Sequence, residues 1–149
     1  MSDLTPVIDR LDIERTIFSL GRCLDERDFE GLRELFTPAG SVSTPGGEVS
    51  GHDALVEQAR LRHSSDDGIQ HLITNLLIEQ DGDQAAVRAN LLVTFAKTGV
   101  GDPAPFLLGE VYHFDLERTP TGWRITHLRS TPVWALNLPA QLAARFEKH

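Results

Sequence analysis

The dipeptide Asp81-Gly82 most constrains the fold, because it stands between two long segments rich in apolar and β-branched residues, 70–80 and 83–96. Asp-Gly between such segments is the strongest short signal of a β-hairpin, since both residues tolerate the backbone angles of a tight turn. A turn centred on this dipeptide predicts that His71 faces Leu92 and shares that face with Asn75.

A second hairpin is predicted from residues 106–118 and 123–134, which a Thr-Pro-Thr-Gly segment joins. The four strands would form a meander, and strands longer than about ten residues usually bend or bulge. Without a bulge, Glu110 and Tyr112 lie on one face with Arg129 close to Tyr112. Neither face of this sheet is plainly polar, so we expect helices on one side and a second subunit on the other, as a homodimer through the sheet.

The residues before the first hairpin have helical spacing. Apolar residues recur at four, three and four positions along a first helix that starts near Thr5-Pro6: Ile13, Ile17, Leu20 and Leu24. A short helix is predicted after Asp28, with Phe36 on its buried side, a third at about 51–63, and a closing helix at 139–146. Helices followed by a bent meander predict an α+β fold with the helices on one sheet face.

Size and composition limit the classes of function. The 149 residues fit one domain, 1–149, and 14 basic against 22 acidic side chains give a formal charge of −8, which disfavours nucleic acid or an anionic membrane as partner. No apolar run approaches the roughly 20 residues of a membrane span. The N-terminus opens acidic, unlike a signal peptide, and Cys23 stands alone, so we expect a cytoplasmic protein without disulfides.

His71 and Asp25 form the candidate catalytic pair. Imidazole changes its protonation near neutral pH, and Asp25 lies at the end of the first helix beyond Gly21, which would leave open space beside the carboxylate. Each residue also has a structural interpretation, as a hydrogen-bonded histidine and as a solvated helix-end charge. Together, a carboxylate bonded to one imidazole nitrogen would make the other a better base, without a metal or organic cofactor.

Glu110, Tyr112 and Arg129 are the other polar candidates. A carboxyl group among apolar neighbours is costly to bury unless it is paired. The group is therefore either a structural Glu110–Arg129 bridge or a donor set in which Tyr112 or Arg129 stabilises a developing oxyanion. The six histidines lack the close spacing of a helix zinc site, and nucleotide-binding and serine-nucleophile motifs are missing, so we predict no cofactor and no metal.

Several segments together resemble the SnoaL-like family, and the match spans nearly the whole chain. They are Ile13-Glu14-Arg15, residues 24–36, Gly51-His52-Asp53-Ala54-Leu55, His71-Leu72-Ile73-Thr74-Asn75, Asp81-Gly82-Asp83 and Gly122-Trp123-Arg124-Ile125. The resemblance implies the nuclear transport factor 2-like fold, a cone-shaped α+β barrel in which three N-terminal helices pack on a strongly curved, mainly antiparallel sheet. Members are commonly dimeric. This fold hosts many activities, so the resemblance says more about architecture than about substrate.

Within that superfamily, Asp25 and His71 match the positions of the catalytic pair of scytalone dehydratase and hexachlorocyclohexane dehydrochlorinase. Two departures concern the dehydratase. Leu24 stands where it has a tyrosine, and residues 41–44 lack its second tyrosine. An arginine on the last strand recurs in the dehydrochlorinase, in the region of Arg129.

The resemblance implies a cofactor-independent lyase or isomerase, similar to a dehydratase or polyketide cyclase, acting on a small, largely apolar cyclic molecule in the cone. His71 would be the general base and Asp25 its orienting partner. From the predicted strand faces, we expect the substrate contacts to be Tyr112, Arg129, Glu110 and Asn75. The alternative is a non-catalytic member that binds a ligand or a partner protein in the same cone.

Overall fold

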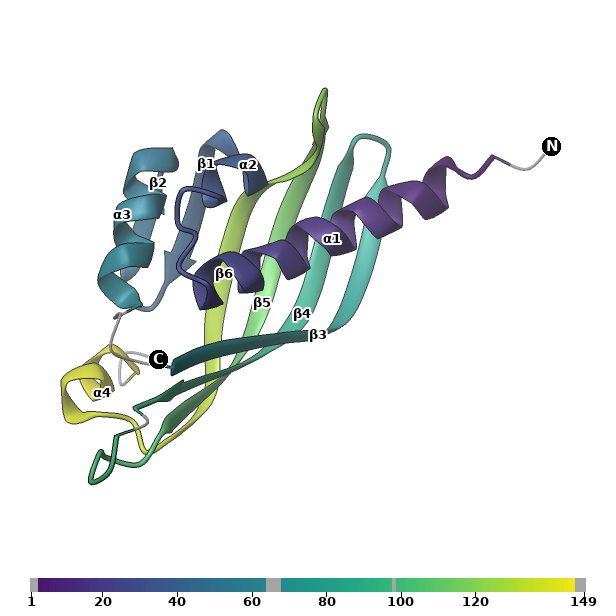
Figure 1. Cartoon of the computed structure of the whole chain (residues 1–149). Coiled ribbons are helices and arrows are strands. Elements are labelled where there is room, and N and C mark those ends of the chain that lie inside the picture. The colour runs from purple at the N-terminus through teal and green to yellow at the C-terminus, as the bar shows by residue number, and fades with distance from the viewer. Residues whose placement is uncertain (1–2, 64–67, 98, 147–149) are drawn as a thin grey trace.

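The computed structural model describes residues 3–63, 68–97 and 99–146 (Figure 1). Its elements, in chain order, are α1 (Thr5–Asp25), α2 (Leu32–Leu35), β1 (Phe36–Thr44), β2 (Gly47–Ser50), α3 (His52–Arg62), β3 (Gly68–Asp81), β4 (Gln84–Ala96), β5 (Phe106–Thr119), β6 (Gly122–Leu136) and α4 (Ala140–Phe146). The predicted α+β order is therefore confirmed, with each predicted helix and long strand present.

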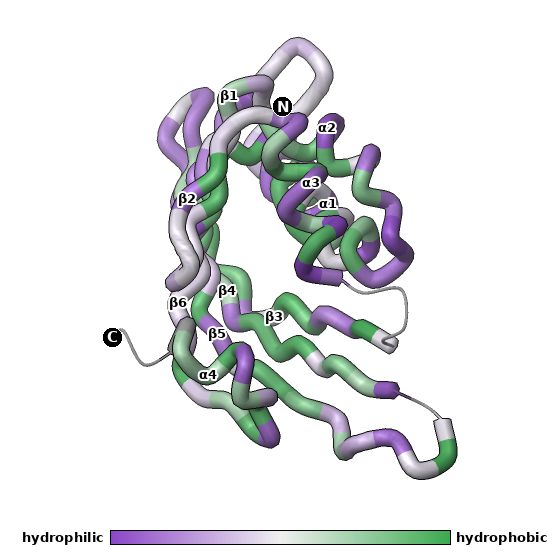
Figure 2. The backbone as a smooth tube through the Cα atoms, turned by 90° about the vertical axis from the view of Figure 1, so that its left-hand side faces the viewer, coloured by the Kyte–Doolittle hydropathy of each residue, from purple (hydrophilic) through white to green (hydrophobic). Residues whose placement is uncertain are grey.

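The strands form one six-stranded sheet in the order β2-β1-β6-β5-β4-β3, in which only the β1–β6 pair is parallel. The long strands curve strongly along their length (Figure 1). Seen from the side, α1, α2 and α3 all lie on one side of the sheet (Figure 2). The face of the sheet toward these helices is the inner face, and none of the three helices covers the opposite, outer face (Figure 2).

The segment from Phe36 was partly mispredicted, because its apolar spacing continues that of the short helix before it. Phe36 instead begins β1, where it pairs with Ile125 of β6 and is buried. The parallel neighbour that bonds this strand lies almost ninety residues away in the sequence. Local spacing contains no information about such a partner, so the sequence pattern alone does not predict this strand.

The predicted register of the first hairpin is wrong by one residue at His71. Asp81 pairs with Gln84, so the turn is centred on Gly82-Asp83, one position later than Asp81-Gly82. A β-bulge then inserts an extra residue at Asn75, whose φ of 55° is left-handed. Beyond the bulge His71 faces Val93 instead of Leu92, and it shares the inner face of the sheet with Ile73.

The predicted register of the second hairpin fails for a similar reason. A bulge at Thr126 in β6 shifts the pairing, so that Tyr112 faces Ser130 and His113 faces Arg129. Because side chains alternate between the faces of a sheet, Arg129 then lies on the outer face, where it is exposed. The predicted contact between Arg129 and Tyr112 does not exist.

Helix α1 packs on the sheet through the apolar stripe that its sequence predicted, and all four stripe residues are buried: Ile13, Ile17, Leu20 and Leu24. At Gly21 the gap between the helix and β3 has room for little more than a methyl group. A Cβ atom at Gly21 would lie 3.5 Å from Ile73 Cδ1 and 3.6 Å from the Cβ atom of His71. The space expected beside Asp25 is therefore filled by β3 itself, which brings His71 next to the end of α1.

The N-terminal half of α1 is anchored by a buried carboxylate that sequence analysis missed. Asp9 accepts two hydrogen bonds from the Arg118 guanidinium, at 2.5 and 2.7 Å, one from Trp123 Nε1 at 3.1 Å and one from Gln80 Nε2 at 2.8 Å. These bonds tie the helix to β3, β5 and β6 and hold the pKa of Asp9 well below its usual range, the Arg118 bonds most strongly. No helix in the described ranges is long and apolar enough to cross a membrane.

Candidate active site

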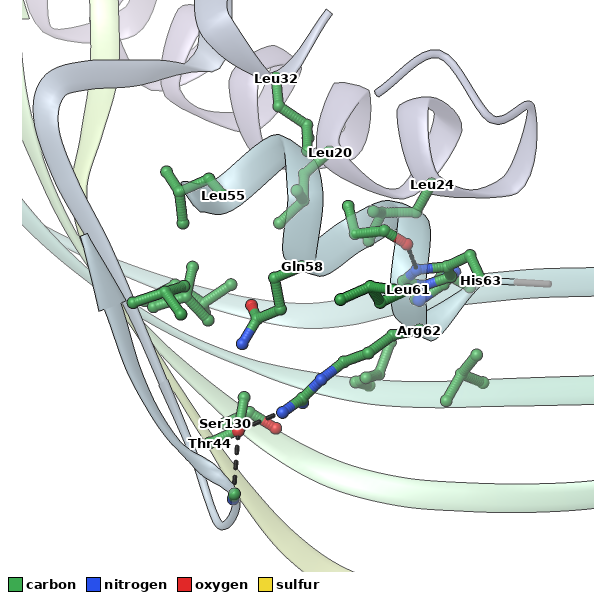
Figure 3. A pocket seen from close by; sticks show the side chains of 18 of the residues that line it. Leu20, Leu24, Leu32, Thr44, Leu55, Gln58, Leu61, Arg62, His63 and Ser130 are labelled. Carbon is green, nitrogen blue, oxygen red and sulfur yellow. Dashed lines mark hydrogen bonds between the residues drawn. The ribbon is translucent and has the colours of Figure 1, made fainter. Parts of the chain in front are cut away.

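A cavity of about 750 Å³ lies between the inner face of the sheet and the helices. This volume falls within the usual range for small-molecule sites. Figure 3 shows leucine side chains of α1, α2 and α3 around it. Most of its wall is apolar: Leu20, Leu24, Leu32, Leu55, Leu91, Val93, Leu108 and Leu128. A few polar side chains interrupt this wall, and they define the candidate site.

His71 lines this cavity and contacts Asp25, the last residue of α1. The His71 Nδ1 atom lies 2.6 Å from Asp25 Oδ1, and the backbone N–H of His71 donates to both carboxylate oxygens at 2.9 and 3.0 Å. The His71 side chain is only 4% exposed and that of Asp25 22% exposed. Because the carboxylate accepts hydrogen bonds from both the ring and the backbone of His71, it holds the imidazole in one orientation.

The contact defines which ring nitrogen of His71 can act as a base. A carboxylate can only accept hydrogen bonds, so Nδ1 carries the proton and donates it to Asp25. The lone pair is then on Nε2. Among the described residues, no group hydrogen-bonds Nε2. This atom keeps some exposed surface, and His71 lines the cavity. The unprotonated nitrogen is therefore open to a bound molecule.

Glu110 and Tyr112 reach the same cavity from β5. The Ser130 hydroxyl of β6 donates a hydrogen bond to Glu110 Oε2. Burial raises the pKa of Glu110 and also raises the pKa of the Tyr112 phenol. Tyr112 packs edge-on against Phe114, with ring centroids 5.6 Å apart. Both groups are thereby favoured in their neutral forms, which can donate a hydrogen bond.

The two remaining predicted contacts, Asn75 and Arg129, do not line the cavity. Asn75 is exposed in the β3 bulge, and Arg129 is exposed on the outer face. The arginine that does line the cavity is Arg62, which donates to Thr44 Oγ1 at 3.2 Å. Figure 3 shows it extending from α3 toward Thr44 and Ser130. Its position in the last turn of a predicted helix suggested only a favourable interaction with the helix dipole.

His63 is a second imidazole that sequence analysis missed. It caps α3, where its Nδ1–H donates to the Ala59 carbonyl oxygen at 2.8 Å, and its ring centroid lies 5.5 Å from that of His71. Burial lowers the pKa of His63 to about 4. The ring beside His71 is therefore neutral at physiological pH and adds no positive charge there.

The low pKa of His63 is directly measurable. We expect its ring proton signals to titrate by NMR with a midpoint near pH 4, well below the value of about 6.5 for an unperturbed histidine. Because the unfolded chain binds this proton below about pH 6.5 and the folded protein does not, the burial of His63 lowers stability progressively as the pH falls from about 6.5 toward 4. A midpoint near 6.5 would contradict the buried, neutral ring.

The described part of the chain contains no group of three or more His, Cys, Asp or Glu side chains placed to hold a metal ion. His71, Glu110 and Tyr112 thus line an apolar cavity, and Asp25 contacts His71 behind its wall. Such a set can move a proton at carbon and stabilise charge on oxygen.

Three kinds of comparison relate the chain to known proteins. The family model for the SnoaL-like domain matches residues 5–129. The uncharacterized protein Rv2910c of Mycobacterium tuberculosis is 27% identical over 127 residues, which cover 84% of this chain and 86% of that protein.

Two solved structures illustrate the likeness in fold. A putative scytalone dehydratase from Novosphingobium aromaticivorans has a TM-score of 0.81 at 21% identity and covers 91% of each chain. The hexachlorocyclohexane dehydrochlorinase LinA-type3 from Novosphingobium barchaimii has a TM-score of 0.80 at 18% identity, over 93% of this chain and 96% of its own. At these identities the comparison establishes the shared architecture alone.

Proposed function

Because the chain belongs to the SnoaL-like domain family, we propose that it is a cofactor-independent lyase or isomerase, dehydratase- or cyclase-like, that acts on a small, largely apolar cyclic substrate. Structural neighbours named as a dehydratase and a dehydrochlorinase are consistent with this class. The observation that carries the proposal is the 2.6 Å contact between His71 Nδ1 and Asp25 Oδ1 at the wall of an apolar cavity.

In the proposed mechanism, His71 Nε2 removes a proton from a carbon next to a carbonyl or a leaving group. Asp25 stabilises the imidazolium that forms and keeps the ring in its productive orientation. The apolar wall excludes water, which strengthens these electrostatic interactions. Tyr112, which lines the cavity, donates a hydrogen bond to an oxygen that gains negative charge.

The proposal is tested without knowing the natural substrate by following 5-nitrobenzisoxazole. A base removes its carbon-bound proton, a nitrile forms, and the N–O bond breaks to release a coloured nitrophenolate. We expect saturable turnover by the wild-type protein and competition by cyclic ketones that occupy the cavity. Turnover no faster than that of a His71→Ala variant would reject a general base at this site.

The alternative function is ligand binding without catalysis, and the mainly apolar wall of the cavity is the observation that favours it. The two functions differ in what His71 contributes. If the protein only binds, His71→Ala should leave the affinity for a cyclic ketone nearly unchanged and no variant should alter a reaction rate. Retained binding with lost turnover would support the enzyme.

We further propose that the outer face of the sheet forms a homodimer. Pairing places four residues in one row across four strands of this face: Leu72, Leu92, Gly109 and Trp134. Leu72 and Trp134 are 44% and 47% exposed, and Leu136 lies exposed beyond them. An apolar row of this kind on an uncovered sheet face is typical of an interface.

The dimer is tested by light scattering coupled to size-exclusion chromatography at micromolar concentration. We expect the wild-type mass to be twice that of the chain and a Trp134→Asp variant to elute as a monomer, since an unpaired carboxylate in an interface is costly. The matched control is Leu11→Asp on the exposed side of α1, which should remain dimeric. A monomeric wild-type protein would reject the interface.

A further inference from the structure

We propose that Glu110 is the proton donor of this site, which delivers a proton to an oxygen atom of the substrate while His71 removes one from carbon. The inference rests on the proposed function of His71. It implies a substrate whose leaving group is an oxygen that needs a proton, in contrast to a halide that leaves as a stable anion.

The positions of the two residues on the sheet support a base at His71 and a proton donor at Glu110. His71 lies on β3 and Glu110 on β5, with only β4 between them. Adjacent strands are about 4.8 Å apart, so β3 and β5 are separated by about 10 Å. The two residues also lie in neighbouring rows of the same face, since Val93 pairs with His71 and Leu91 pairs with Glu110. Both side chains line the cavity, and Leu91 and Val93 of β4 form the apolar floor between them. A small molecule on this floor would have the base at one side and the carboxyl group at the other.

The hydrogen bonding of Glu110 suits a neutral acid. Ser130 donates to Oε2, which leaves Oε1 to carry a proton. Among the described residues, no group hydrogen-bonds Oε1, and this atom keeps some exposed surface. The carboxyl group can therefore donate its proton into the cavity.

Nearby positive charges and burial shift the pKa of Glu110 in opposite directions, and burial has the larger effect. Positive charge on His71 of β3 or Arg62 of α3 favours the ionised carboxylate, as does the hydrogen bond from Ser130. Tyr112 on the same strand is neutral, because burial, the largest effect, raises the pKa of its phenol. Desolvation by the apolar wall is the largest effect, so the pKa of Glu110 lies above its usual range.

The step balances without a co-reactant. His71 Nε2 takes the proton as the C–H bond breaks, and its electron pair forms the new C=C bond. The C–O bond breaks with its electron pair going to oxygen, which receives the Glu110 proton and leaves as water or an alcohol. The imidazolium then returns its proton to the Glu110 carboxylate through the cavity, which restores both groups.

The experiment compares two benzisoxazoles that differ in the basicity of the departing phenolate. The 5-nitro compound releases a stable anion, whereas the unsubstituted compound releases a phenolate that benefits from protonation. Glu110→Gln can still accept the Ser130 hydrogen bond. We expect this variant to lower the elimination rate of the unsubstituted compound by roughly 100-fold and that of the 5-nitro compound by less than about threefold. Glu79→Gln, at an exposed position, should slow neither.

Infrared spectroscopy of the wild-type protein gives an independent readout if the variant folds poorly. We expect a carboxylic-acid stretching band at neutral pH that disappears in Glu110→Gln or shifts when glutamate is labelled with carbon-13. Equal slowing of both compounds, slowing of neither, or an ionised Glu110 at neutral pH would overturn the proposed donor. If the wild-type rate did not depend on His71 at all, the proposed function itself would be overturned, so the two failures are distinguishable.

Discussion

Replacement of His71 by alanine is expected to lower kcat/KM for 5-nitrobenzisoxazole by about 100- to 10,000-fold, the usual contribution of a positioned general base. The imidazole is buried beside Asp25 and lines the cavity, and no other group there combines an accessible lone pair with an orienting carboxylate among the described residues. The measurement is the initial rate of nitrophenolate release by the purified variant, with circular dichroism to confirm that the fold is retained.

Two further variants make this result specific. His113→Ala removes an exposed imidazole from the outer face and should keep the wild-type rate. Asp25→Asn keeps an oxygen that accepts the His71 backbone N–H, but its amide would donate to Nδ1 and place the ring proton on Nε2. We expect most of the His71 effect from this change and little additional loss in the double variant, because the pair acts as a unit. An unaltered rate in Asp25→Asn would contradict the orienting role.

Replacement of Asp9 by alanine is expected to lower the Tm by roughly 10 °C, which would be the largest effect on stability among the variants considered. The carboxylate is 4% exposed, and its removal leaves Arg118, Trp123 and Gln80 without the acceptor they share. A buried network that loses its central acceptor is one of the few causes of severe destabilisation by a single substitution. The measurement is thermal unfolding followed by circular dichroism.

The same carboxylate predicts how stability depends on pH. Because the folded pKa of Asp9 is lowered, its contribution is complete above the usual aspartate pKa of about 4 and is lost as the pH falls through the lowered value. Asp9→Asn should therefore flatten the acid limb of the Tm curve. Asp53→Asn, which removes an exposed partner of Arg33, is the matched control and should shift the Tm by less than about 2 °C. An acid limb that is the same in Asp9→Asn and wild type would reject this assignment.

The candidate site was predictable in part. Residue type and the family resemblance led to Asp25 and His71, which the structure brings into contact. Residue type also led to Glu110 and Tyr112, which line the cavity with His71. Arg62 and His63 escaped notice because their only local signal is a place at the end of a helix. Each becomes part of the site through burial against residues far away in the sequence.

Arg129 and Asn75 show the opposite error. Both were assigned to the site from strand alternation, and both lie outside it, because a bulge in β6 turns Arg129 to the outer face and Asn75 itself forms the bulge in β3. A bulge leaves little signal in the local sequence, yet it reverses the face of each residue beyond it. Alternation alone is therefore a poor guide to which side of a long strand faces a cavity.

The order and type of the long elements follow from local patterns, because a helical stripe such as Ile13 to Leu24 and a turn such as the one near Gly82 are written in neighbouring residues. The face of the sheet on which the His71 side chain lies does not follow from local patterns. It depends on one inserted residue in β3 and on the packing of α1 against the sheet near Gly21. These are contacts between segments distant in the sequence, and their free energies become defined only when the chain has folded around the cavity.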